Sequence, residues 1–130
     1  MFDRKAYEYS DPVKYKVVEY LNKNGIYTIC YEDKCTEDIK ALFPCNIEVE
    51  HRTMWKGEYF PYNTISIPYR KYKHKKQNTY FYIVNNELTF AYIVHSELLL
   101  NEYIVIKNTT REKGEKFFHI PISKCERIKI

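Results

Sequence analysis

Hydrophobic residues recur with a helical period near the start of the chain and with shorter, strand-like patterns after it. Within residues 10–25, Val13, Val17 and Leu21 lie at helical spacing, and Pro12 suits the first turn of a helix. This spacing predicts one amphipathic helix near the N-terminus of the sequence. The later apolar stretches are too short for long helices and are rich in β-branched and aromatic residues, which favours strands.

The short apolar stretches divide the rest of the chain into strands and turns. We expect strands at 26–31, 38–43, 46–52, 64–68, 79–84, 88–94, 103–107 and 116–122. Turns at Asn85-Asn86 and around Gly114 predict hairpins, and residues 96–101 favour a short helix. The sequence therefore predicts one α/β (α+β) domain over residues 1–130, with a mixed sheet, an N-terminal helix and additional C-terminal β-hairpins.

Residues 46–52 (NIEVEHR) begin with a strict alternation of polar and apolar side chains. Glu48 and Glu50 therefore project from the same face of the predicted strand, and Asp38 can face them from the strand before it. Three convergent carboxylates form the oxygen-rich site that Mg²⁺ prefers, and phosphodiester hydrolysis is a natural use of such a site. The alternative interpretation is an ordinary solvated strand face.

Composition excludes several classes of protein. The chain has 130 residues, and no apolar run approaches the ~18 residues of a membrane span, so we exclude a membrane protein. With only 3 glycines, a phosphate-cradling glycine loop is not expected. The N-terminal residues contain no signal-peptide pattern, so we expect a cytoplasmic protein whose 4 cysteines stay reduced. The composition of the chain, which is rich in Lys, Asn, Ile and Tyr, resembles that of proteins from AT-rich genomes, including many phages.

Positive charge is concentrated in residues 70–76, here called the basic segment. The net charge of the chain is +4, and this segment alone contains five cations and no acid: Arg70, Lys71, Lys73, Lys75 and Lys76. Such a segment attracts a polyanion through counterion release, and the neighbouring Tyr69 and Tyr72 rings could stack on bases. The alternative is a solvated face that keeps the protein soluble.

The order of these motifs resembles the PD-(D/E)XK nuclease superfamily, which includes Holliday-junction resolvases and restriction endonucleases. The resemblance covers residues 10–52 and rests on a Glu-bearing helix, a following strand, TEDIKAL and NIEVEHR. It implies a restriction-endonuclease-like mixed sheet flanked by helices and a metal-dependent endonuclease that uses Mg²⁺ or Mn²⁺. Carried over by motif, Asp38, Glu48 and Glu50 would be catalytic metal ligands, and Glu19 of the helix would be an accessory ligand.

The resemblance also implies DNA as substrate and a homodimer that cuts both strands. The five cations of the basic segment would then contact the phosphate backbone of the DNA. The chain departs from the family pattern because Glu50 stands where the family has Lys, so a displaced cation such as Lys40, Lys71 or Arg70 would supply the missing charge. This departure supports the alternative function, a non-catalytic viral interaction protein that binds a host protein or nucleic acid in the host cytoplasm.

A zinc site is the other metal hypothesis. Cys30, Cys35, Cys45 and His51 are spaced C-x4-C-x9-C-x5-H. Structural zinc sites usually bring their ligands in close pairs such as C-x2-C, and this spacing contains none. The sequence therefore favours magnesium over zinc.

Overall fold

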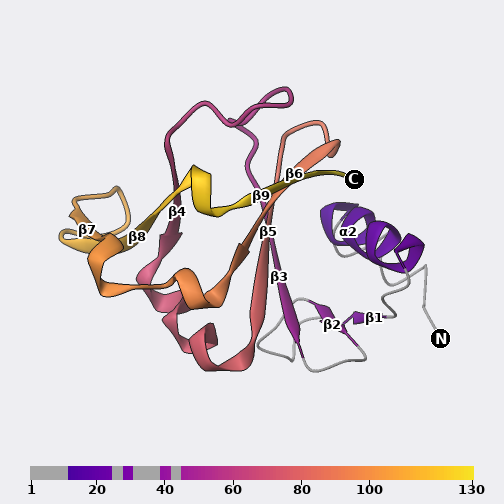
Figure 1. Ribbon diagram of the computed structural model, residues 1–130. Helices are drawn as coiled ribbons and strands as arrows, with labels where there is room; N and C mark the ends of the chain where they lie inside the picture. Colours follow the sequence, from indigo (N-terminus) through magenta and orange to yellow (C-terminus); the bar gives the residue numbers. More distant parts are fainter. Residues whose placement is uncertain (1–11, 25–27, 31–38, 42–44) are drawn as a thin grey trace.

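The computed structural model describes residues 12–24, 28–30, 39–41 and 45–130, of which 28–30 and 39–41 are described as backbone only. Their elements belong to an α+β fold with a helix, a larger sheet and a smaller sheet (Figure 1). In chain order these are α2 (Pro12–Lys23), β1 (Thr28–Cys30), β2 (Ile39–Ala41), β3 (Asn46–His51), β4 (Thr64–Pro68), β5 (Thr79–Val84), β6 (Phe90–His95), β7 (Ile104–Lys107), β8 (Glu115–Pro121) and β9 (Glu126–Lys129). No helix among these described residues is long and apolar enough to cross a membrane.

The larger sheet is mixed, with strand order β1-β2-β3-β5-β6-β9. Strands β1, β2 and β3 form an antiparallel meander, and β5 then pairs in parallel with β3, in a register that sets Glu48 beside Phe81. A parallel neighbour requires a crossover connection, because a tight turn can only reverse the chain. Here the crossover is residues 52–78, and it contains both β4 and the basic segment.

The smaller sheet is antiparallel, with order β4-β8-β7. The predicted hairpin around Gly114 is its β7-β8 pair, and β4 joins the other edge of β8. The chain then returns to the larger sheet as β9, which pairs with β6.

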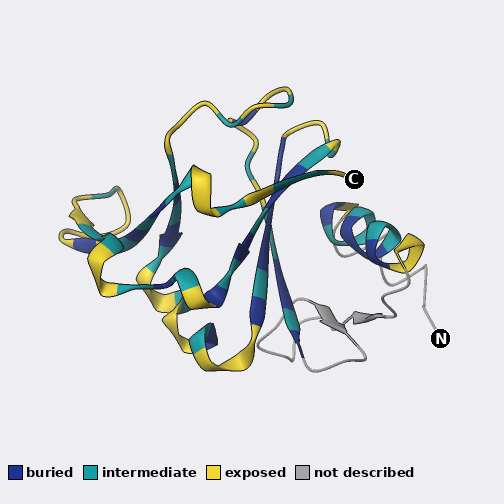
Figure 2. Ribbon diagram, viewed as in Figure 1, coloured by how far each residue is buried: buried dark blue, intermediate teal, exposed yellow. Residues whose placement is uncertain are grey.

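Two hydrophobic clusters hold these layers together, one on each face of the larger sheet. On one face, α2 packs its buried residues against inward-facing residues of β3, β5 and β6; this cluster comprises Val13, Val17, Val18, Leu21, Ile47, Tyr82, Val84 and Ala91. On the other face, β5 and β6 pack against the smaller sheet; this cluster comprises Trp55, Ile65, Ile67, Phe81, Ile83, Tyr92, Val94, Leu99, Phe118 and Ile120. Strand β5 is buried on both faces for this reason (Figure 2).

Most predicted elements are confirmed within the described residues, but one strand was missed and two expectations need correction. Residues 126–129 form strand β9, which the sequence analysis did not predict. The segment 96–101 is not one short helix, because it contains the 3-10 helix η2 (Ser96–Leu98) and the start of η3 (Asn101–Tyr103). The strands divide between two sheets, since β4, β7 and β8 cover the face of the first sheet that α2 leaves open.

Candidate active site

Strand β3 separates its apolar and acidic side chains between the two faces of the larger sheet. Ile47 and Val49 face the α2 cluster, as alternation along a strand requires. Glu48 and Glu50 therefore face the smaller sheet, and Glu48 is only 5 % exposed. The predicted placement of the two carboxylates on one side of the strand is consistent with this geometry, but Glu48 is buried and so is not part of a solvated face.

Both carboxylates line a cavity of about 220 Å³ at the junction of the two sheets. Arg70 and Lys71, which begin the basic segment, line the same cavity. Its complete lining is Glu48, Val49, Glu50, Ile67, Pro68, Arg70, Lys71, Phe81 and Ile83. Two acids of β3 therefore line the same cavity as two cations that lie at least 20 positions later in the sequence.

The cations reach the cavity because the basic segment folds as the 3-10 helix η1 (Tyr69–Gln77) directly after β4. Pro68 ends β4, and Asn78 ends η1 with a φ of 48°, a left-handed conformation that Asn tolerates better than most residues. The turn at Asn78 leads directly into β5, the neighbour of β3. Helix η1 is therefore held between the two sheets, beside Glu48.

Glu48 has two basic neighbours on η1. Its Oε1 lies 2.8 Å from Lys71 Nζ and 3.5 Å from His74 Nε2. The His74 side chain is fully buried, and its Nδ1 lies 3.2 Å from Gln77 Oε1. A buried carboxylate needs such partners, since an unpaired charge away from water is strongly destabilising.

Glu50 has a different cationic partner. Arg52 Nε donates to Glu50 Oε1 at 2.6 Å, and another nitrogen of the same guanidinium donates to the carbonyl of Ser66 in β4. The sequence analysis missed Arg52, although its position two residues after Glu50 on an alternating strand was a usable signal. It also missed His74, for which the sequence offers no local signal.

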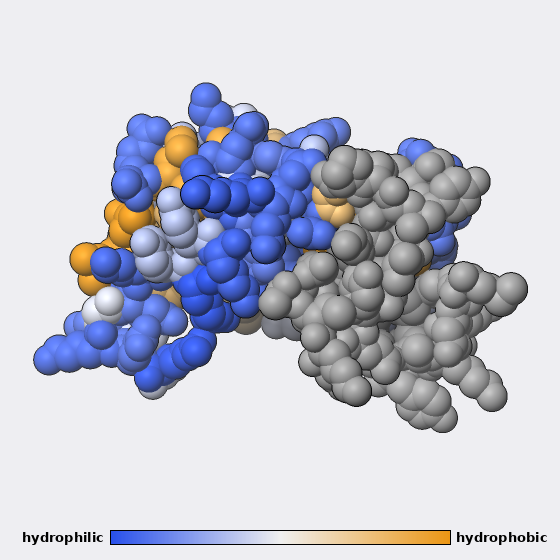
Figure 3. All heavy atoms as spheres, turned by 90° about the horizontal axis from the view of Figure 1, so that it is seen from below, coloured by the Kyte–Doolittle hydropathy of each residue, from blue (hydrophilic) through white to orange (hydrophobic). Residues whose placement is uncertain are grey.

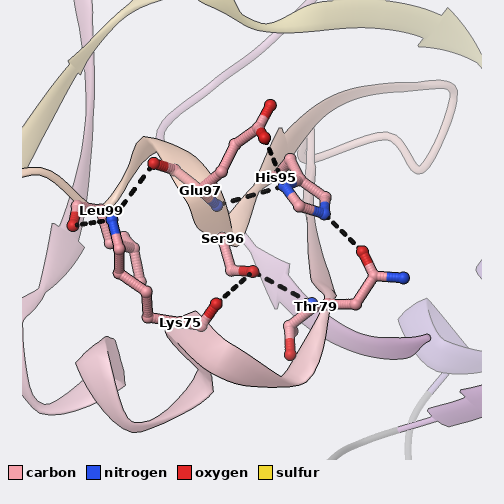
Figure 4. A network of polar contacts seen from close by, with 7 residues as sticks. Lys75, Thr79, His95, Ser96, Glu97 and Leu99 are labelled. Carbon is pink, nitrogen blue, oxygen red and sulfur yellow. Dashed lines mark hydrogen bonds and ion pairs between the residues drawn. The ribbon is translucent and has the colours of Figure 1, made fainter. Parts of the chain in front are cut away.

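The five cations of the basic segment have different surroundings. Lys75 Nζ donates to the carbonyls of Glu97 and Leu99, at 3.3 and 2.9 Å, and Figure 4 shows it within a polar network. In the same network, Ser96 Oγ accepts from the Thr79 amide at 3.1 Å. Lys75 therefore helps to fix η1 and η2 in place.

Three other cations of the segment are available at the surface. Arg70, Lys73 and Lys76 are exposed. Figure 3 views the molecule from the side on which η1 lies, and the described part of that face is largely hydrophilic. These three exposed cations could contact a polyanion at the surface.

One predicted ligand lies outside the described residues, and another lies away from the cavity. Asp38 lies outside the described residues. Glu19 belongs to α2, on the opposite face of the larger sheet from Glu48, and it lies 3.5 Å from Lys23 in a helical i,i+4 pair. The structure therefore does not bring Glu19 to Glu48, because α2 covers the face of β3 that carries Ile47 and Val49.

The donor set of the cavity suits a hard divalent cation. Mg²⁺ is usually held by one or two carboxylates, with water and phosphate oxygens completing its coordination. Glu48 and Glu50 supply the carboxylates, whereas no group of three His, Cys, Asp or Glu side chains forms a metal-binding cluster within the described residues. Mg²⁺ or Mn²⁺ bound here would be held by these two carboxylates, each of which pairs with a cation in this structure.

The zinc hypothesis gains no support from the described ligand candidates. Cys45 is a buried free thiol, and burial raises its pKa, which disfavours the thiolate that zinc binds. His51 is exposed, and its Nε2 lies 3.1 Å from the Asn86 carbonyl. The side chains of Cys30 and Cys35 lie outside the described residues.

Comparison with known proteins finds no family model that matches the chain and no curated protein of similar sequence. Function is therefore argued from the residues of the cavity and the surface around it.

Proposed function

We propose that this chain is a metal-dependent endonuclease of the PD-(D/E)XK type that hydrolyses phosphodiester bonds of DNA. The observation that carries the proposal is the shared cavity of Glu48, Glu50, Arg70 and Lys71. Paired carboxylates with adjacent cations are what phosphodiester hydrolysis needs, because the reaction develops negative charge on phosphoryl oxygens beside a bound divalent ion.

The topology supports the same proposal. A helix followed by an antiparallel meander, with Glu48 and Glu50 on its third strand, matches the order of elements on which the resemblance rests. Strand β5 then extends the sheet in parallel with β3, which gives the mixed sheet that the resemblance implies. The chain departs from the family between these two strands, where it places β4 and the 3-10 helix η1 instead of an ordinary α-helix.

Each charged residue of the cavity has a role in the proposed reaction. Bound Mg²⁺ or Mn²⁺ would polarise the scissile phosphate and lower the pKa of the attacking water. Glu48 would hold the ion, and Glu50 would serve as a second ligand or orient the water. Lys71 lines the cavity beside Glu48 and is the displaced cation that stands in for the family Lys, while exposed Arg70 would bind a phosphate oxygen.

Asp38 and a homodimer remain part of the proposal. Asp38 would complete the ligand set from the start of β2, and two copies of the chain would cut both strands of DNA. Glu19 is left out of the proposed metal site, because α2 holds it on the other face of the sheet.

One observation favours the second candidate function, a non-catalytic protein that binds nucleic acid or a host protein. Glu48 and Glu50 already have cationic partners, Lys71 at 2.8 Å and Arg52 at 2.6 Å. Such pairs can serve structure alone, and they compete with a metal ion for the same oxygens.

A cleavage assay separates the two functions. The protein is incubated with branched, duplex and single-stranded DNA, with Mg²⁺ or Mn²⁺ and then with chelator. We expect metal-dependent cleavage that Glu48→Gln abolishes while DNA binding persists, and the matched control Glu102→Gln, an exposed residue on η3, should cleave like the unmodified protein. Absence of cleavage on every substrate, or full activity of Glu48→Gln, would refute the nuclease proposal.

A further inference from the structure

A second cavity lies next to the first, beside the end of β4 and the start of η1. Its volume is about 350 Å³, and it is lined by Pro68, Tyr69, Arg70, Arg111, Glu112, Gly114, Glu115 and Lys116. Pro68 and Arg70 line both cavities. A ligand that occupied the second cavity would therefore lie next to the Glu48 site.

The surface beside this cavity carries a rigid aromatic platform. The rings of Tyr69 and Tyr72 are nearly parallel, with an interplanar angle of 3° and centroids 5.7 Å apart. Both rings also stack against Phe118, with centroids 5.4 and 6.1 Å away, and Phe118 is fully buried. The two tyrosines nevertheless remain 39 % and 42 % exposed.

Cations surround the platform. Lys116 Nζ lies 5.5 Å from the centroid of the Tyr69 ring, while Arg70 and Arg111 line the cavity next to it. Of the two acids in the lining, Glu115 is largely buried and accepts a hydrogen bond from Thr109 Oγ1 at 3.1 Å, so its carboxylate is engaged within the β7-β8 turn.

Exposed rings interleaved with cations are suited to single-stranded nucleic acid. Every base has an apolar face that stacks on an aromatic side chain, and the cations neutralise the phosphates on either side. Bases in an intact duplex are already stacked on one another, so the platform can contact them only where the strands are open.

We propose that the Tyr69-Tyr72 platform binds unpaired bases of single-stranded DNA and so delivers a single-stranded segment, or the unpaired part of a branched substrate, to the Glu48 cavity. This inference deepens the proposed nuclease function, on which its second half rests. Arg70 links the two parts, because it lines both cavities and can contact the phosphate between a stacked base and the scissile bond.

Binding without metal tests the platform separately from catalysis. The probe is a fluorescent oligothymidylate of about twelve nucleotides, compared by anisotropy with an abasic oligomer that has the same number of phosphates and with a duplex. The variant Tyr72→Leu keeps an apolar side chain against Phe118 but removes the exposed ring, and Tyr72→Phe keeps the ring as a matched control. Fluorescence of Trp55, which is 1 % exposed, verifies that each variant is folded.

We expect Tyr72→Leu to bind oligothymidylate about 5- to 150-fold more weakly, the range for loss of one base stack, and Tyr72→Phe to bind like the unmodified protein. The abasic oligomer should bind weakly to all three proteins. Equal affinity for oligothymidylate and the abasic oligomer, or unchanged binding by Tyr72→Leu, would refute the proposal that the Tyr69-Tyr72 platform stacks on bases. The binding assay contains no metal, so it tests base stacking separately from cleavage. Stacking can be demonstrated even if no DNA is cleaved, and cleavage can be observed even if the rings do not stack on bases.

Discussion

The ion pair between Lys71 and Glu48 predicts an asymmetry between two substitutions of the same contact. Lys71→Met removes the ammonium 2.8 Å from Glu48 Oε1 and leaves a carboxylate whose side chain is 6 % exposed. Glu48→Gln leaves instead an ammonium whose side chain is already 31 % exposed and can turn into water. The free energy of unfolding should therefore fall more for Lys71→Met than for Glu48→Gln.

The magnitude follows from the burial of each partner. Removing one partner of a fully buried ion pair costs about 3–5 kcal/mol, because the remaining charge is left without compensation. Lys71 is only partly buried and His74 still faces Glu48 at 3.5 Å, so we expect about 1–3 kcal/mol for Lys71→Met. For Glu48→Gln we expect roughly 1 kcal/mol or less, since the amide keeps the shape and most hydrogen bonds of the acid.

Urea unfolding followed by tryptophan fluorescence measures both changes. The chain has a single tryptophan, Trp55, which is buried against Phe60 and Tyr92 in the cluster between the two sheets. Lys73→Met is the matched control, because Lys73 lies on the same 3-10 helix and is exposed. A cost for Lys71→Met no larger than for this control, or smaller than for Glu48→Gln, would refute the reasoning.

Divalent cations extend the same experiment to the proposed metal site. In the unmodified protein Lys71 competes with a metal ion for Glu48, and Lys71→Met removes that competitor. Added Mg²⁺ at ten times its Kd for Lys71→Met should therefore stabilise this variant by about 1.4 kcal/mol, and the same concentration should stabilise the unmodified protein less. Addition of Glu48→Gln to this variant should abolish the effect, and an Mg²⁺ effect that persisted there would place the ion elsewhere.

Two further predictions concern the basic segment and a histidine of the smaller sheet. Replacing the three exposed cations Arg70, Lys73 and Lys76 by Ala should flatten the log–log salt dependence of binding by about 2 units for single strands, or nearly 3 for duplex DNA, and an unchanged slope would assign them to solubility. Burial, and secondarily the charge of Lys107, lowers the pKa of His119 in the folded protein. The unfolded chain therefore binds more protons than the folded protein below pH 6.5, and the free energy of unfolding falls as the solution is acidified. His119→Gln should lose less stability between pH 7 and pH 5 in urea unfolding; an identical loss would contradict this.

Local patterns in the sequence predict most of the elements and the side to which their residues point. Helical spacing fixes α2, and strict alternation fixes the faces of β3, because side chains alternate along a strand whatever its neighbours are. The shared face of Glu48 and Glu50 follows from the same rule. The turn at Asn85-Asn86 gives the β5-β6 hairpin for a similarly local reason.

Which strands pair and which segments pack together depends on the tertiary structure. A periodic pattern identifies a buried face without identifying what covers it, so the sequence could not predict that β3 and β5 pair in parallel across 27 intervening residues. That crossover brings Lys71 and His74 to Glu48, fixes Lys75 in a structural network, and leaves Glu19 on the far side of the sheet. Strand β9 was missed because its four residues include a single apolar side chain, Ile128, and are held by pairing with β6. The carboxylates of the candidate site could therefore be read from the sequence, whereas their cationic partners depend on the packing of distant segments.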